Sequence, residues 1–231
     1  MKKFFKRCAL LACMLVLIGT ASIVTIGYER YQKVREELPL SEVVSQVQTE
    51  AGYTKLEHID SKFIEAIIAV EDPSFYSHQG LHLAKIVEAM ITDIIHLDYV
   101  MGGSTITQQL AKNLFLDQDK NLARKVAEAF LARDLEATLT KDEILELYLN
   151  VIYFGDGYYG IQEAAQGYFG KDASSLTLNE ATLLAGLPQA PAVYQLSNGM
   201  ELAKKRQAIV LQAMINQNLI TTEQARLSVQ K

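Results

Sequence analysis

The chain has 231 residues and a formal net charge of −5. This length fits one medium domain with an anchor, and it leaves no room for a second large catalytic domain. Hydrophobic residues make up 49% of the sequence, which is enough for a sizeable core and excludes a disordered chain.

The N-terminus carries four cations within residues 2–7, followed by an uncharged run over residues 8–27. At about 1.5 Å per residue this run spans about 30 Å, the thickness of a bilayer core. We predict a cytoplasmic tail (1–7), a single transmembrane helix (8–27) and an extracytoplasmic remainder, because basic flanks stay inside. The alternatives are a cleaved signal peptide and a lipoprotein modified at Cys13. The run is long for the first, and apolar residues follow Cys13, which disfavours the second.

Both cysteines, Cys8 and Cys13, lie in the predicted membrane segment. The exported part therefore has no disulfide, no cysteine nucleophile and no cysteine-ligated zinc. Removing the +4 tail leaves a charge of −5 − 4 = −9 on that part. Such an acidic domain is a poor binder of nucleic acid, so an anionic ligand needs a local basic cluster.

The remainder divides into a polar, partly helical stalk (28–58) and a domain over residues 59–231. Apolar residues recur at helical spacing from Phe63 to Val70, and Asp72-Pro73 ends that helix. Threonine followed three residues later by Gln or Glu predicts helix starts at Thr105, Thr140 and Thr177. The fold is predicted to be mostly α, with further helices at 83–95, 106–115, 122–138, 140–149, 177–187, 201–217 and 222–229.

Glu71 is the first candidate for chemistry. It ends an apolar helix, where the helix dipole disfavours a carboxylate by roughly 0.3–1 kcal/mol. Apolar surroundings would raise its pKa, which suits a general base. The competing interpretation is a solvated acid at a helix end.

A second candidate site begins at Gly102-Gly103, a glycine pair before a helix N-terminus, which is a generic anion site. Ser104, Gln108 and Lys112 follow at i, i+4 and i+8, which places three polar groups on one helix face. A solvated helix face is the alternative.

Lys120, Arg124, Lys125 and Glu128 form the third candidate site. Arg124 and Glu128 alone would be a surface ion pair worth a few tenths of a kcal/mol. Together with Lys112, however, four cations and one glutamate in an acidic domain suit a phosphate-bearing ligand.

Other candidates are weaker. His78 and His82 have metal-like spacing, but Gly80 lies between them and no third ligand is obvious. The serines lack a partnered His/Asp motif. Several aromatic residues could stack on sugar, although core packing explains most of them: Tyr153, Tyr158, Tyr159, Tyr168 and Phe169.

These segments resemble glycosyltransferase family 51, the peptidoglycan glycosyltransferases. Residues 71–80 (EDPSFYSHQG) resemble its first motif, and residues 102–113 (GGSTITQQLAKN) resemble its second. Residues 124–128 (RKVAE) resemble the third, and residues 141–150 (KDEILELYLN) the fourth. The likeness covers roughly residues 55–225, including a further stretch at 184–191 (LAGLPQAP).

The resemblance implies a lysozyme-like, two-lobed helical domain that polymerises lipid II and releases undecaprenyl pyrophosphate. Glu71 would be the base that deprotonates the acceptor 4-hydroxyl. Glu128, helped by Lys112, Arg124, Lys125 and a divalent cation (Mg²⁺ or Mn²⁺), would stabilise the pyrophosphate. The reaction would invert the anomeric centre. Pyrophosphate is a good leaving group, so charge neutralisation matters more than a proton donor.

By motif position, the resemblance also implies a larger set of substrate-binding residues and partners. The partners would be lipid II, the lipid-linked glycan, the membrane and other cell-wall synthesis proteins. The set is Phe75, His78, Gly103, Ser104, Thr105, Gln108, Gln109, Lys112, Asn113, Lys120, Arg124, Lys125 and Asn150.

Three positions depart from the family pattern. Lys120 replaces a common arginine, Glu88 reverses a charge, and Met101 replaces a frequent glutamine. The sequence also predicts a monofunctional enzyme, because it ends soon after the glycosyltransferase motifs. A lysozyme-like glycan-cleaving enzyme and an inactive membrane scaffold are the alternatives. The first predicts two acidic roles and no cationic cluster, and the second predicts eroded motifs.

Overall fold

The computed structural model describes residues 2–82, 103–117, 119 and 121–230. Within these residues the chain is helical apart from loops, short 3-10 turns and one isolated antiparallel bridge between Tyr153 and Tyr159. This confirms the mostly α prediction. The helices are α1 (Lys2–Glu37), α2 (Leu40–Gln48), α3 (Ser61–Glu71), α5 (Ile106–Phe115), α6 (Leu122–Thr138), α7 (Lys141–Val151), α8 (Ile161–Phe169), α9 (Leu178–Gly186), α10 (Pro191–Tyr194), α11 (Met200–Asn216) and α12 (Thr222–Ser228).

Helix starts follow local capping chemistry. Thr105, Thr140 and Thr177 each form a complete capping box, in which the threonine and the third helical residue bond each other's backbone N–H. The predicted helices at 106–115 and 122–138 have the observed bounds. The predicted helix at 83–95 lies outside the described residues. Helix α8 was missed, because the residue before its start, Gly160, has no side chain to cap it.

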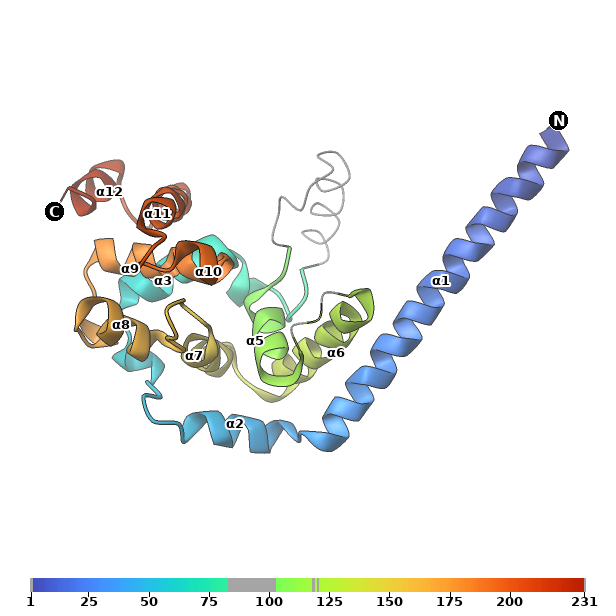
Figure 1. The fold of residues 1–231 in the computed structure, drawn as a ribbon, viewed down its shortest axis with the longest axis horizontal. Helices are drawn as coiled ribbons and strands as arrows, with labels where there is room; N and C mark the ends of the chain where they lie inside the picture. Colours follow the sequence, from blue (N-terminus) through green and yellow to red (C-terminus); the bar gives the residue numbers. More distant parts are fainter. Residues whose placement is uncertain (1, 83–102, 118, 120, 231) are drawn as a thin grey trace.

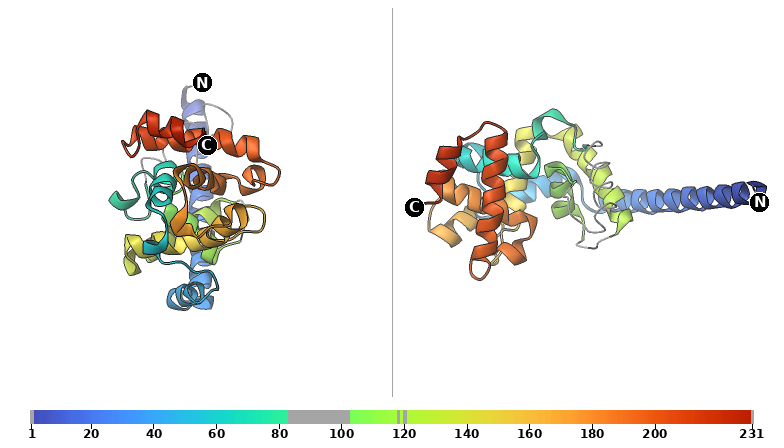
Figure 2. Two further views of the ribbon diagram at one scale, coloured as in Figure 1. Left: turned by 90° about the vertical axis from the view of Figure 1, so that its left-hand side faces the viewer. Right: turned by 90° about the horizontal axis from the view of Figure 1, so that it is seen from above.

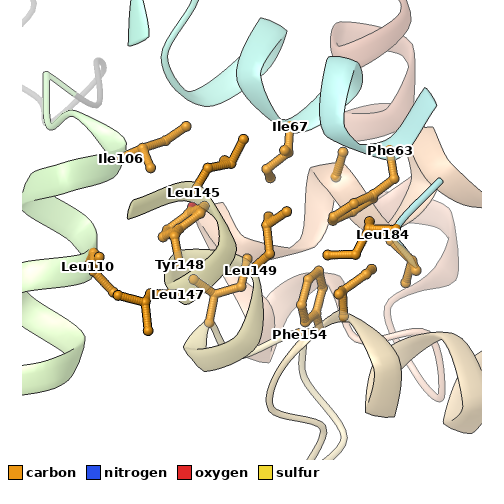
Figure 3. Packing of buried hydrophobic residues seen from close by; sticks show 14 of the residues in the cluster. Phe63, Ile67, Ile106, Leu110, Leu145, Leu147, Tyr148, Leu149, Phe154 and Leu184 are labelled. Carbon is orange, nitrogen blue, oxygen red and sulfur yellow. The ribbon is translucent and has the colours of Figure 1, made fainter. Parts of the chain in front are cut away.

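The core is built around α7. In Figure 3, Leu145 of α7 lies between Ile106 of α5 and Ile67 of α3, and Leu149 lies between Ile67 and Leu184 of α9. Helix α3 packs on α9 and α11, and α5 packs on α6 and α7. This arrangement brings the end of α3, and therefore Glu71, beside both α5 and α11.

Helix α1 extends away from the rest of the molecule, and the C-terminal helices lie at the opposite end (Figures 1 and 2). Residues Leu10–Glu37 form a helix long and apolar enough to cross a membrane by length and composition. The single N-terminal apolar helix was predicted from the sequence.

The segment predicted as a stalk packs against the domain. Residues 28–37 continue α1, and Tyr31 donates a 2.9 Å hydrogen bond to Asp134 Oδ2 of α6. In α2, Leu40, Val43 and Val47 are buried against the core. The N-terminal helix is therefore docked on the domain, and the boundary at residue 59 stays a prediction.

Candidate active site around α5

Glu71 is the last residue of α3, and its side chain is only 10% exposed. Its Oε2 accepts a 2.8 Å hydrogen bond from Gln109 Nε2 on α5. The amide of Gln109 is itself oriented by Tyr148, whose hydroxyl donates to Gln109 Oε1 at 3.1 Å. Burial, followed by the charges of Glu71 and Asp72, raises the pKa of Tyr148 well above its ordinary value, so the phenol stays a donor. One carboxylate oxygen is therefore held by two successive hydrogen bonds.

The other oxygen, Glu71 Oε1, is buried and accepts no hydrogen bond within the described part of the chain. Its nearest charged neighbour is Arg206 of α11, with Nη2 at 3.6 Å. Burial raises the pKa of Glu71, and the Gln109 hydrogen bond and the charges of Arg206 and Lys112 oppose that rise. A poorly hydrated carboxylate with a raised pKa is a stronger base than an exposed one.

Lys112 lies one turn after Gln109 on α5, so both side chains share a helix face. Burial lowers the pKa of Lys112, while the nearby charges of Glu128 and, more weakly, Glu71 raise it. The ammonium therefore interacts with both candidate acids.

Glu128 is buried in α6, with its side chain 2% exposed. Arg124, one turn earlier, places Nη1 3.0 Å from Glu128 Oε2, and Lys125 Nζ contacts Glu128 Oε1. Lys125 also donates to Ser104 Oγ, in the segment before α5. The interpretation of Arg124 and Glu128 as a surface ion pair is wrong, because Glu128 is buried and Arg124 is largely buried. Lys112, Arg124, Lys125 and Glu128 together form what we call the cation cluster, with a formal charge of 3 − 1 = +2.

Asp72 and His78 connect the end of α3 to the start of α5. Asp72 Oδ2 accepts from the backbone N–H of Ile106 at 3.2 Å and lies 2.8 Å from His78 Nε2. A buried carboxylate at the N-terminus of α5 satisfies an unpaired helix N–H and complements the helix dipole. Phe75 is fully buried, with its ring under the Lys141 ammonium at 4.4 Å. In this structure His78 contacts the carboxylate that joins the end of α3 to α5, and Phe75 has no surface for a substrate.

Several other predicted site residues have structural partners. Thr105 and Gln108 are buried in the capping box of α5, and Thr105 also donates to Gly80 O at 2.6 Å. Asn150 bonds the backbone of Thr54 through both amide atoms, at 2.7 and 2.9 Å. Asn113 is exposed, and Gly103 lies in the segment before α5. Lys120, Glu88 and Met101 lie outside the described residues.

The divalent cation expected beside Glu128 fits these side chains poorly as a protein-held ion. Within the described ranges no group of three or more His, Cys, Asp or Glu side chains could hold a metal. Both oxygens of Glu128 already face cations, and a metal there would be repelled by Lys112, Arg124 and Lys125. The donor set of these cations fits a phosphate directly.

Sequence reasoning missed two residues that contact the Glu71 network. Tyr148 lay inside the fourth motif without a role, and Arg206 lay outside every motif. Arg206 could have been found from its position in the sequence, because it lies on the same face of α11 as the buried residues Ala203, Val210 and Met214. A cation on an apolar stripe needs a buried partner, and only the folded chain identifies that partner as Glu71.

Several known proteins are similar to this chain in sequence. The chain is 47% identical over 179 residues to penicillin-binding protein 1A of Aquifex aeolicus, covering 78% of this chain and 25% of the relative. It is 39% identical to penicillin-binding protein 1A of Escherichia coli, covering 96% and 28%. It is 40% identical to penicillin-binding protein 1F of Bacillus subtilis, covering 93% and 31%. The chain thus spans about a quarter to a third of the length of these relatives.

A crystal structure of penicillin-binding protein 1A from Haemophilus influenzae matches with a TM-score of 0.47 and 24% identity, over 78% of this chain and 17% of that one. The model of a protein family described as transglycosylase matches residues 37–215, well over half of the sequence. The chain therefore belongs to the transglycosylase family.

Proposed function

We propose that this chain is a peptidoglycan glycosyltransferase, which polymerises lipid II into β-1,4-linked glycan and releases undecaprenyl pyrophosphate. One observation carries the proposal: α5 bonds the buried carboxylate of Glu71 through Gln109 and also carries Lys112 of the cation cluster, whose other members lie on α6. Glycosyl transfer from a diphosphate needs a base for the acceptor and positive charge for the leaving group.

On the acceptor side, Glu71 takes the proton from the 4-hydroxyl of lipid II. The resulting oxygen attacks the anomeric carbon of the lipid-linked donor from the face opposite the diphosphate, so the configuration inverts. Gln109 and Tyr148 hold Glu71 Oε2, which leaves Oε1 with free lone pairs for the proton. Holding the base in one orientation is worth more than its basicity alone, because misplacement by about 1 Å can cost 10²-fold in rate.

On the donor side, the bond between the anomeric carbon and the diphosphate oxygen breaks, and its electron pair leaves with the diphosphate. Lys112, Arg124 and Lys125 neutralise that charge. Glu128 holds Arg124 and Lys125 in place, because its two oxygens contact one cation each. Cations that are already oriented need little reorganisation as charge develops.

A lipid-linked substrate also fits the surroundings of the cation cluster. An apolar groove of about 570 Å³ lies between α1 and α6, lined by Ile23 and Val24 of α1 and by Val126 and Phe130 of α6. Lys125 of the cation cluster also lines this groove. We propose that the polyprenyl chain enters beside α1 while its diphosphate contacts the cluster, with α1 in the membrane and the domain outside the cytoplasm.

The test is to incubate the detergent-solubilised full chain with labelled lipid II and to separate polymer from cleavage products. We expect glycan polymer from the wild type, and a loss of at least 10²-fold in Glu71→Gln. Glu65→Gln, on the same helix, is the matched control and keeps full activity. Polymerisation by Glu71→Gln at the wild-type rate would contradict the assignment of the base, and cleavage of preformed glycan would contradict the proposed reaction.

A further inference from the structure

Arg206 of α11 faces Glu71 and has no role in the mechanism proposed above. Its side chain is 10% exposed, and its Nη2 lies 3.6 Å from Glu71 Oε1. Its Nε is buried and has no hydrogen-bond partner within the described residues. Burying a guanidinium is costly unless an opposite charge compensates, and the carboxylate that faces it is Glu71.

The surrounding helices fix the position of Arg206. A Cβ on Gly186 of α9 would lie 2.9 Å from Arg206 Cγ, so this glycine leaves room for the arginine stem. The next residue, Gln207, donates to Asn179 O at 2.8 Å and to Thr182 Oγ1 at 3.0 Å, which ties α11 to α9. At the far end of α11, Gln217 donates to Ala69 O of α3 at 3.0 Å. These contacts place the stem of Arg206 against α9 and hold α11 on α9 and α3.

We infer that Arg206 is a positioning residue for Glu71, whose guanidinium keeps the carboxylate ionised and holds Oε1 facing the acceptor hydroxyl. This inference rests on the proposed function. Gln109 fixes one oxygen by a hydrogen bond, and Arg206 acts on the other by charge at 3.6 Å. Because Arg206 makes no hydrogen bond to Oε1, that oxygen keeps the lone pairs that the acceptor proton needs.

The other charged groups facing Glu71 do not replace Arg206. Asp72, the next residue, opposes ionisation of Glu71, and Lys112 of α5 favours it more weakly than Arg206 does. Tyr148 of α7 is a neutral phenol that contacts Gln109. On α9, which packs against α3, Glu180 is paired with Lys171. Arg206 is therefore the main cationic support of Glu71 among the described residues.

The experiment measures kcat/KM for lipid II against pH in the full-length protein, for the wild type, Arg206→Met and Arg206→Lys. An opposite charge within 4–6 Å shifts a carboxyl group by about 1–3 pH units. We expect the acidic limb of the profile to move up by about one pH unit or more in Arg206→Met, and to return toward the wild type in Arg206→Lys. Lys205→Met, an exposed neighbour on the same helix, should leave the limb unchanged.

A second measurement separates this inference from the proposed function. Carboxyl ¹³C NMR titrates Glu71 directly, with its signal assigned by its absence in Glu71→Gln. An upward shift of that titration in Arg206→Met supports the inference even if the chain polymerises no lipid II. An unmoved titration and limb in Arg206→Met would overturn it, as would an equal shift in Lys205→Met. Arg206→Gln is a second neutral variant. If both neutral variants fail to fold and only Arg206→Lys folds, the inference is also overturned, because the positive charge would then be needed for folding.

Discussion

Gln109 of α5 donates a 2.8 Å hydrogen bond from Nε2 to Oε2 of Glu71 at the end of α3. The two residues come from different motifs, and the bond joins the acceptor-side carboxylate to the helix that also carries Lys112. The position of the proposed base is thus tied to that of Lys112, because α5 bonds Glu71 through Gln109 and carries Lys112 one turn later.

Tyr148 should matter through Gln109. Tyr148→Phe removes the hydroxyl that donates to Gln109 Oε1, and the half-buried amide loses a partner. We expect a loss of about 1 kcal/mol in the free energy of unfolding. We also expect kcat to fall several-fold with little change in KM, because Gln109 then orients Glu71 less well. Tyr159→Phe, 58% exposed, is the control, and an equal effect there would contradict this role.

Glu71 should also affect stability in a pH-dependent way. Burial raises the pKa of Glu71 in the folded protein above the ordinary 4.5, so folding favours the protonated form. Its contribution to stability is present below pH 4.5 and is lost as pH rises through the folded pKa. Glu71→Gln, which mimics the neutral acid, should therefore gain stability relative to the wild type as pH increases. Thermal unfolding between about pH 4 and pH 8 measures this difference.

The opposite trend would contradict that argument. If Glu71→Gln became less stable than the wild type at high pH, the ionised carboxylate would be stabilising the fold. Glu65→Gln should show no such trend between the two ends of the pH range.

Lys112 should be required for substrate binding more than for folding. Burial lowers the pKa of Lys112, because the ammonium loses hydration in the folded protein. A bound diphosphate would compensate for that loss by pairing with the charge. Lys112→Met should raise KM for lipid II by about 10- to 100-fold, consistent with a charge-assisted contact of about 1.5–3 kcal/mol. Its melting temperature should stay the same or rise. Lys204→Met, exposed on α11, is the control, and an unchanged KM in Lys112→Met would exclude this role.

The docking of α1 can be tested at two glycines of the same helix. A Cβ on Gly27 would lie 2.5 Å from Val126 Cβ and 2.6 Å from Ala123 O of α6, whereas Gly19 has no atom within 4 Å. Gly27→Ala should therefore lower the free energy of unfolding by about 1–3 kcal/mol through overpacking. Gly19→Ala should be neutral or stabilising, because alanine favours helices.

The two alanine variants are compared by their thermal unfolding in detergent and by their rate of lipid II turnover in liposomes. We expect Gly27→Ala to slow turnover, because α1 and α6 together line the groove beside the cation cluster. Equal stability of the two alanine variants would show that α1 is not docked at Gly27.

The sequence by itself determined the local structure and the order of the motifs. Capping boxes at Thr105, Thr140 and Thr177 predicted three helix starts, because each involves residues only three positions apart. Helical periodicity and the Asp72-Pro73 break placed Glu71 at a helix end. The uncharged N-terminal run predicted an apolar helix, since length and composition suffice for that.

Only the tertiary structure decided which side chains meet. The pairing of Arg206 with Glu71, the support of Gln109 by Tyr148 and the docking of α1 on α6 join residues far apart in the chain. Asn150 likewise has the backbone of Thr54 as its partner, which no motif indicates. Local periodicity tells which face of a helix is buried, but the partner across that face depends on how the helices pack around α7.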